Sequence, residues 1–185
     1  MYKISKNLLP GIIVLTPSRH EDERGYFSEI WNKRDFKDMG LDVDFVQENH
    51  SLSIHSGTVR GLHFQAPPFA QAKLVRCGKG KILDVAVDIR KSSPTFGQHV
   101  AVELTGDNKH QLFVPHGFAH GFIVLSNSAT FAYKVDNYFA PEHDRGIAFD
   151  DKELKIDWQL SEEELQLSEK DMAHPPLANA KNLFE

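Results

Sequence analysis

The stretch Leu83-Asp84-Val85-Ala86-Val87-Asp88-Ile89-Arg90 alternates large apolar residues with small or charged ones. An alternation with a period of two places every second side chain on the same face of an extended strand. The branched or long apolar side chains of this stretch therefore share one sheet face. Residues 83–90 are predicted to form a β-strand.

Similar but shorter patterns lie on both sides of this strand. Alternating apolar residues occupy 100–104 and 131–135, and short apolar runs occupy 112–114 and 122–125. Turn-forming residues separate them at 79–80, 92–94, 106–108, 115–117 and 126–128. Many short strands spaced by about ten residues are typical of an antiparallel sandwich or small barrel. An all-β fold is therefore expected.

Helical signals are few and short. Residues 33–39, which end at Gly40, are expected to form one short helix. Ser161 followed three residues later by Glu164 has the form of a capping box, which predicts a short helix in a C-terminal extension at about 160–185. Because neither a repeat nor a linker divides the chain, residues 1–185 are interpreted as a single domain.

Composition excludes several classes of protein. With 185 residues, 41% of them hydrophobic, the chain can bury a full core without disulfides or a structural metal. A net charge of −5 argues against nucleic acid as a partner, and no apolar run approaches the roughly 18 residues that a membrane helix needs. Cys77 is the single cysteine, so an intramolecular disulfide is excluded, and we expect a cytoplasmic protein.

Two histidines stand in frames that resemble the motifs of cupins, small β-barrels of the jelly-roll kind. They are His63 in Gly57-Thr-Val-Arg-Gly-Leu-His63-Phe-Gln65 and His120 in Pro115-His-Gly-Phe-Ala-His120-Gly-Phe. A metal-binding cupin has a second His where this chain has Gln65, and a Glu where it has Lys73. A lysine ammonium has no lone pair and repels a divalent cation. We therefore expect an organic acid–base site and no metal.

Each of these residues also has an ordinary structural explanation. A single histidine on a strand is most often structural, and Lys73 could be a solvated strand residue. Two candidates further along the chain have similar explanations: Tyr133 could be a core aromatic residue, and Asp171 could cap a turn. The combination of His63 with Lys73 and His120 at motif spacing is what favours a site.

Longer strings carry a narrower resemblance. From about residue 10 to 178 the chain resembles the dTDP-4-dehydrorhamnose 3,5-epimerases. The matching strings include Arg24-Gly-Tyr-Phe27, Phe45-Val-Gln47-Glu48-Asn49-His-Ser51, Gly57-Thr-Val-Arg60-Gly-Leu-His63-Phe-Gln65, Gln71-Ala-Lys73, Asp84-Val-Ala-Val-Asp88-Ile-Arg90, Pro115-His-Gly-Phe-Ala-His120-Gly-Phe122, Tyr133-Lys134 and Leu167-Ser-Glu-Lys-Asp171.

The resemblance implies a cupin-like antiparallel jelly-roll barrel with a few short peripheral helices, mainly C-terminal. It also implies inversion at C3 and C5 of a dTDP-4-ketosugar without a cofactor. Members of the family are homodimers whose N-terminal strands are exchanged between chains and complete the partner's nucleotide site. In this chain residues 12–15 could serve as such a strand, because an apolar edge strand is a liability unless it is paired.

The resemblance assigns four catalytic roles. His63 is the base, and Asp171 holds its imidazole from the other ring nitrogen. Tyr133 is the acid on the opposite face of the sugar, and Lys73 stabilises negative charge on the C4 oxygen.

It also implies a set of substrate-binding residues. Arg24 and Arg60 would bind phosphate, and Phe27 and Phe139 would stack on the thymine or sugar. The remaining positions are Glu29, Gln47, Glu48, Asn49, His120, Asp144 and Lys170. Three of these positions differ from the usual pattern, because Glu48 is commonly Asp, Asp144 often Glu and Phe139 often Tyr.

Three alternatives stay open at this point. A relative could epimerise C3 alone or modify the same ketosugar in another way. A metal-dependent cupin would need more ligands than Gln65 and Lys73 allow. A non-enzymatic sugar-nucleotide-binding cupin would keep the pocket but would not need both His63 and Tyr133.

Overall fold

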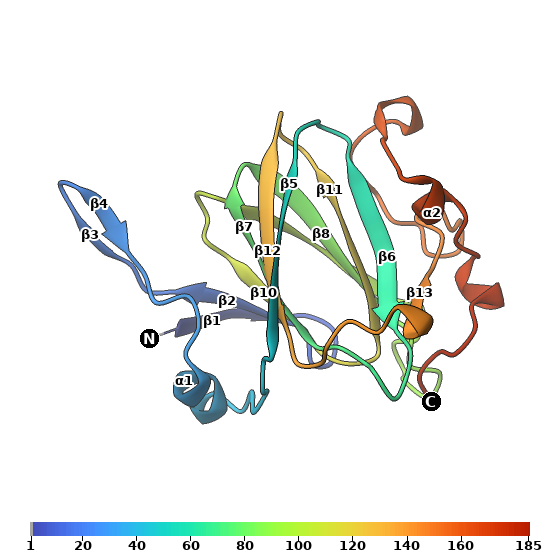
Figure 1. The fold of residues 1–185 in the computed structure, drawn as a ribbon, viewed down its shortest axis with the longest axis horizontal. Coiled ribbons are helices and arrows are strands. Elements are labelled where there is room, and N and C mark those ends of the chain that lie inside the picture. The colour runs from blue at the N-terminus through green and yellow to red at the C-terminus, as the bar shows by residue number, and fades with distance from the viewer. Residues whose placement is uncertain (1) are drawn as a thin grey trace.

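Two antiparallel sheets face each other in a computed structural model, which describes residues 2–185 (Figure 1). The first sheet contains, in spatial order, β1 (Tyr2–Asn7), β2 (Ile13–Pro17), β10 (Gln111–Val114), β7 (Lys73–Lys79), β12 (Ala129–Val135) and β5 (Gln47–Ser53). The second contains β13 (Asp144–Gly146), β6 (Val59–Gln65), β11 (Phe118–Val124), β8 (Lys81–Asp88) and β9 (His99–Thr105). The predicted all-β, cupin-like barrel is confirmed.

Strand β8 confirms the alternation that predicted it, but both of its faces are buried. Leu83 and Val85 pack outward against Trp158 and Leu177 of the C-terminal segment. The other face looks into the barrel, where Ala86 joins the core between the sheets. In Figure 1 the C-terminal segment, in orange and red, covers the outer side of the second sheet beside β6.

The helices are short and peripheral. The helix α1 (Lys33–Asp38) begins at Asn32, whose side chain accepts a hydrogen bond from the backbone N of Arg34, and it buries Phe36. The predicted capping box at Ser161 is present, but it starts only one 3₁₀ turn, η2 (Glu162–Glu164). The remaining turns are α2 (Glu169–Met172), η1 (Pro141–His143) and η3 (Leu177–Asn179).

The N-terminal region divides into two parts. Strand β2, which contains residues 13–15 of the segment that could be exchanged, lies between β1 and β10 of the same chain. A small hairpin of β3 (His20–Asp22) and β4 (Gly25–Phe27) projects away from the barrel (Figure 1). Phe27 on this hairpin is 71% exposed.

Glycines allow β6 and β11 to approach closely. A Cβ on Gly61 would lie 2.5 Å from the Cα of Gly121, and Gly61 has a φ of +132° that other residues rarely adopt. Two residues further along β6, His63 lies directly opposite His120 in the antiparallel register. Opposed residues of an antiparallel pair share one sheet face, so these two imidazoles lie on the same wall of the barrel.

No helix among residues 2–185 has the length and apolar character to cross a bilayer.

Candidate active site

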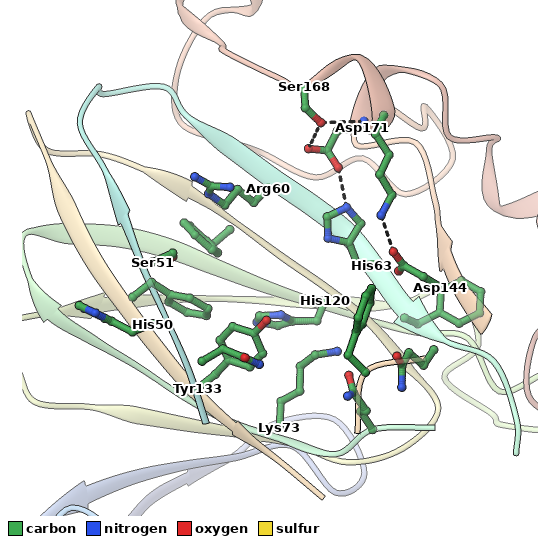
Figure 2. Close-up of a pocket in the computed structure, with 18 residues that line it drawn as sticks. His50, Ser51, Arg60, His63, Lys73, His120, Tyr133, Asp144, Ser168 and Asp171 are labelled. Carbon is green, nitrogen blue, oxygen red and sulfur yellow. Dashed lines mark hydrogen bonds and ion pairs between the residues drawn. The ribbon is translucent and has the colours of Figure 1, made fainter. Parts of the chain in front are cut away.

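A cavity of about 480 Å³ opens between the two sheets (Figure 2). Eighteen residues line it, and ten of them were predicted as site residues. These ten are Asn49, Arg60, His63, Lys73, His120, Tyr133, Phe139, Asp144, Lys170 and Asp171.

The two sheets contribute different chemistry to the cavity. His63 and His120 project from β6 and β11 of the second sheet, whereas Lys73 and Tyr133 project from β7 and β12 of the first. Figure 2 shows His63 and Tyr133 on opposite sides of the cavity. An imidazole and a phenol therefore face one enclosed volume from two walls.

The imidazole of His63 is held from behind. Its Nε2 lies 2.5 Å from Oδ1 of Asp171. The buried carboxylate of Asp171 also accepts a hydrogen bond from the Ser168 hydroxyl, at 2.8 Å from Oδ2, and Ser168 is the N-cap of α2. With Nε2 donating to Asp171, the lone pair of a neutral ring is on Nδ1. This arrangement is a base with an orienting carboxylate.

Burial and hydrogen bonding act in opposite directions on Asp171. Burial, the largest single influence, raises its pKa, but the hydrogen bond and charge of His63 together with the Ser168 hydroxyl outweigh it. The pKa of Asp171 is therefore lowered, and the carboxylate is ionised at neutral pH. The ionised carboxylate accepts the hydrogen bond from Nε2 of His63 and holds the ring in place.

Lys73 places a cation in the cavity, although burial disfavours its charged form. Its side chain is almost fully buried, and burial lowers its pKa to about 8, although the charges of Asp144, Asp84 and Asp136 counteract this shift. Below pH 8 the ammonium is present and can stabilise a developing oxyanion.

A second histidine–carboxylate pair lies beside it. Nε2 of His120 lies 2.8 Å from Oδ1 of Asp84, whose side chain is completely buried. Burial raises the pKa of Asp84, while His120 and Lys73 counteract this effect. Asp84 was not predicted as a site residue. In the sequence Asp84 is a charged residue within an apolar strand. From the alternation alone, such a residue is assigned to the solvent-facing side of the strand.

Tyr133 is suited to donate a proton. Burial is the largest influence on its phenol and raises its pKa, and the negative charge of Asp144 adds to this, whereas a hydrogen bond to Asn49 acts in the opposite sense. The phenol is therefore protonated at neutral pH. Asn49 lies directly opposite Tyr133 in the register of β5 and β12, which explains their contact.

Gln65 stabilises the mouth of the cavity. Its amide donates to the backbone carbonyls of Phe69 and Tyr138, and its carbonyl accepts from the backbone N of Ala140 at 2.6 Å. At the position where a metal cupin has a ligand, this chain thus has a side chain with three backbone partners. The loop that it holds carries Phe139 at the rim.

Charged and aromatic groups surround the mouth. Lys170 forms an ion pair with Asp144, Arg60 lies on β6, and the ring of Phe139 is 57% exposed. Gln47 does not line the cavity. Its amide nitrogen donates to Oδ1 of Asn49 at 3.0 Å, and its amide oxygen accepts from the backbone N of Phe139 at 3.2 Å. It supports two residues that do.

Four predicted binding residues lie away from this cavity in the same chain. Glu48 points to the opposite face of β5, because its neighbours Gln47 and Asn49 face inward and adjacent side chains alternate. There Glu48 accepts a hydrogen bond from Lys134 at 2.7 Å. The other three, Arg24, Phe27 and Glu29, lie on or beside the projecting hairpin of β3 and β4 and are exposed.

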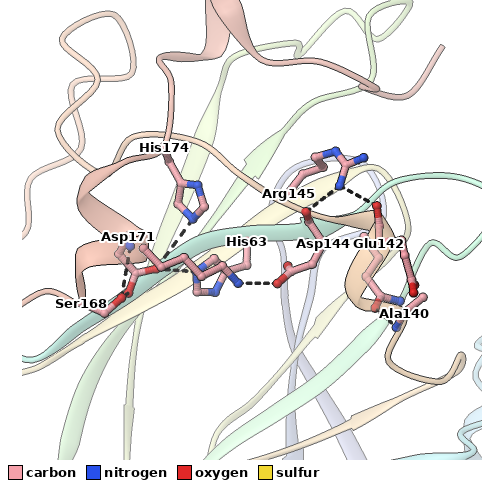
Figure 3. A network of polar contacts seen from close by, with 10 residues as sticks. His63, Ala140, Glu142, Asp144, Arg145, Ser168, Asp171 and His174 are labelled. Carbon is pink, nitrogen blue, oxygen red and sulfur yellow. Dashed lines mark hydrogen bonds and ion pairs between the residues drawn. The ribbon is translucent and has the colours of Figure 1, made fainter.

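His174 was not predicted as a site residue, and the structure places it against His63. Its ring stands edge-on to that of His63 with centroids 5.5 Å apart, and its Nε2 lies 3.8 Å from Oδ1 of Asp171 (Figure 3). Burial lowers its pKa, and the neighbouring His63 adds to this effect. No sequence motif marks it.

A jelly-roll barrel whose cavity opposes a carboxylate-oriented imidazole to a protonated phenol defines a cupin-like isomerase that works by acid–base chemistry. The family model described as dTDP-4-dehydrorhamnose 3,5-epimerase matches residues 6–179. The chain belongs to this family, as its sequence predicted.

Individual relatives agree with this assignment. The chain is 48% identical over 181 residues to the dTDP-4-dehydrorhamnose 3,5-epimerase of Salmonella typhimurium, with 97% of this chain and 98% of the relative covered. The crystal structure of the enzyme from Elizabethkingia anophelis has a TM-score of 0.92 at 46% identity and covers 98% of both chains. The structure from Legionella pneumophila in complex with dTDP-4-keto-L-rhamnose has a TM-score of 0.92 at 44% identity and covers 97% and 94%.

Proposed function

We propose that this isomerase inverts C3 and C5 of dTDP-4-dehydro-6-deoxy-D-glucose and gives dTDP-4-dehydro-L-rhamnose. The observation that carries the proposal is the placement of His63 and Tyr133 on opposite sides of one cavity. Inversion needs a proton to leave one face of a carbon and another to arrive on the opposite face. A single base on one wall would give exchange without inversion.

The C4 ketone makes the hydrogens on C3 and C5 acidic. Nδ1 of His63 takes the proton, and the electron pair of the C–H bond moves into an enolate whose charge rests on the C4 oxygen. The Lys73 ammonium stabilises that oxygen. Tyr133 then donates its phenolic proton to the opposite face of the carbon. Proton exchange with solvent restores His63 and Tyr133 before the second carbon reacts.

The mouth of the cavity suits a nucleoside diphosphate. Arg60 and Lys170 provide cations for phosphate oxygens, and Phe139 provides an exposed aromatic face. Two neighbours support this choice, because the Legionella pneumophila structure is a complex with dTDP-4-keto-L-rhamnose and a Bacillus anthracis structure, 43% identical, has TDP and PPi bound. We infer the same class of ligand for this chain.

The active assembly is proposed to be a homodimer. Arg24, Phe27 and Glu29 lie outside the cavity of their own chain, on or beside a hairpin that projects from the barrel. If the hairpin of one chain completes the nucleotide site of its partner, each site takes Arg24 from one chain and His63 from the other. Arg24→Ala and His63→Asn then each inactivate a site through a different chain. Co-expressed variants would then form mixed dimers with one intact site. Recovered activity supports the exchange, and its absence contradicts it.

The cytoplasmic location stays a prediction.

The first test of the reaction is mass spectrometry of dTDP-4-dehydro-6-deoxy-glucose after incubation with the protein in D₂O containing a chelator. Uptake of two deuterons supports double epimerisation without a metal ion. One deuteron would indicate a C3-only enzyme, like the 3'-monoepimerase of Streptomyces bikiniensis, which is 31% identical to this chain. No uptake would favour a binding protein or another substrate.

A further inference from the structure

Behind the proposed base lies a cluster with the composition of a transition-metal site. His63, Asp171 and His174 each offer one ligand atom, and these three atoms lie within 4.8 Å of one another. Within the part of the chain that the structure describes, this is the one such group of three. Two imidazoles and one carboxylate are a ligand set that Zn²⁺ uses in proteins.

The cluster is incompletely satisfied as it stands. Nε2 of His174 is buried and has no hydrogen-bond partner in the described structure. It lies 3.8 Å from Oδ1 of Asp171, the oxygen that also contacts Nε2 of His63. Nitrogen atoms of both rings therefore converge on one carboxylate oxygen.

The place of His174 depends on a glycine. A Cβ on Gly146 would lie 2.3 Å from atoms of the His174 ring, so the absence of a side chain at Gly146 provides the space that the ring fills. Gly146 is the register partner of His63 on β6. The backbone of β13 thus fixes where the second imidazole can lie.

We propose that His63, Asp171 and His174 bind a Zn²⁺ ion that inhibits the enzyme. Zinc bonds to nitrogen and oxygen measure about 2.0–2.2 Å, so tetrahedral ligand atoms are about 3.3 Å apart. The 3.8 Å contact needs to shorten by about 0.5 Å, and the 2.5 Å contact needs to lengthen by about 0.8 Å. Water would supply the fourth ligand. When Nε2 of His63 binds the ion, the hydrogen of the neutral ring moves from Nε2 to Nδ1, and Nδ1 no longer has a lone pair to take a proton from the substrate.

The location of this site predicts the type of inhibition. His174 does not line the substrate cavity, and Nε2 of His63 faces Asp171 on the protein side. Zinc there withdraws electron density from the ring and separates the base from its orienting carboxylate, while the cavity stays open. We therefore expect zinc to lower kcat with little change in KM. A metal bound in the cavity would instead compete with the substrate and raise KM.

The inference is independent of the proposed reaction, because binding is measured without substrate. Titration of the metal-free protein with ZnCl₂ against a chromogenic chelator is expected to show one tight site per chain, and Co²⁺ is expected to give the visible absorption of a tetrahedral site. His174→Gln is expected to weaken binding at least about tenfold, since even the loss of an outer partner of a ligand typically costs 10–100-fold.

The matched control is His116→Gln. His116 also contacts a carboxylate, Asp136, at 2.8 Å, but belongs to no group of three among the described residues. Its removal is expected to leave zinc affinity unchanged. Gly146→Ala provides a second variant, because it displaces the His174 ring and keeps both histidines. The absence of a tight site, or zinc affinity that is equal in wild type, His174→Gln and Gly146→Ala, overturns the inference.

Discussion

The imidazole of His120 is anchored by the carboxylate of Asp84, with Nε2 and Oδ1 2.8 Å apart and the carboxylate completely buried. Asp84→Ala leaves this imidazole without its partner at the wall of the cavity. We expect a loss of about 1–3 kcal/mol in the free energy of unfolding and reduced turnover. Denaturant unfolding measures the first. Glu103→Ala breaks an exposed ion pair with Lys81 and is expected to change stability by at most about 1 kcal/mol.

Asp171→Asn tests the orientation of the base. An amide keeps the shape of the carboxylate but removes the negative charge that faces Nε2 of His63. By analogy with the orienting aspartate of serine proteases, kcat is expected to fall by about 10²–10⁴-fold, with a smaller change in KM. Ser168→Ala, which removes one hydrogen bond to Asp171, is expected to have a weaker effect. Wild-type turnover in Asp171→Asn would contradict the role of this pair.

Tyr133→Phe separates proton removal from inversion. His63 is intact in this variant, so the substrate is still deprotonated, but no phenol delivers a proton to the opposite face. Deuterium uptake is expected to continue, with return of the label on the original face, while inversion falls by about 10²–10⁴-fold. Comparing mass spectrometry with the stereochemistry of the product measures both. Equal losses of exchange and inversion would contradict this division of roles.

The pH dependence of turnover reports on Lys73. Its pKa is about 8, so the ammonium that stabilises the C4 oxygen is lost as the pH rises above that value. We expect kcat to decrease above about pH 8. In Lys73→Arg the guanidinium stays charged, so any activity that remains is expected to lack this decrease. An unchanged alkaline limb in the variant would assign it to another group.

Lys73 also makes stability depend on pH. Its pKa in the folded protein, about 8, lies below the ordinary lysine value of 10.5, so between these values the unfolded chain binds more protons and stability rises with pH. The cost of charging the buried amine at pH 7 is on the order of 3 kcal/mol. Lys73→Met is expected to be more stable than wild type at pH 7, with a smaller advantage at pH 10. Thermal unfolding at both values measures this difference.

Local patterns in the sequence predicted much of the fold. The alternation in residues 83–90 and the turn residues between short apolar runs correspond to β8 and its neighbours, and α1 begins and ends within a residue of its predicted bounds. Alternation, turn residues and helix caps are reliable signals because each depends only on residues within one strand, turn or helix. The burial of both faces of β8 was not foreseen, because its outer face is covered by Trp158 and Leu177, distant in sequence.

The site was predictable where a residue stands in a motif and less so where its place depends on register. Glu48 lies in the same string as Asn49, and only the direction of each side chain on β5 separates the outer face from the cavity. Asp84 and His174 became visible through their contacts with His120 and His63. Neither contact is encoded by spacing along the chain.

The pair of His63 and Asp171 joins two residues that are 108 positions apart. A contact between residues so far apart in the chain carries a loop-closure entropy cost that the rest of the fold must offset. Cleavage before Ser168 would leave a barrel whose His63 has no carboxylate to orient its ring, and it would also remove Leu177 from the outer face of β8.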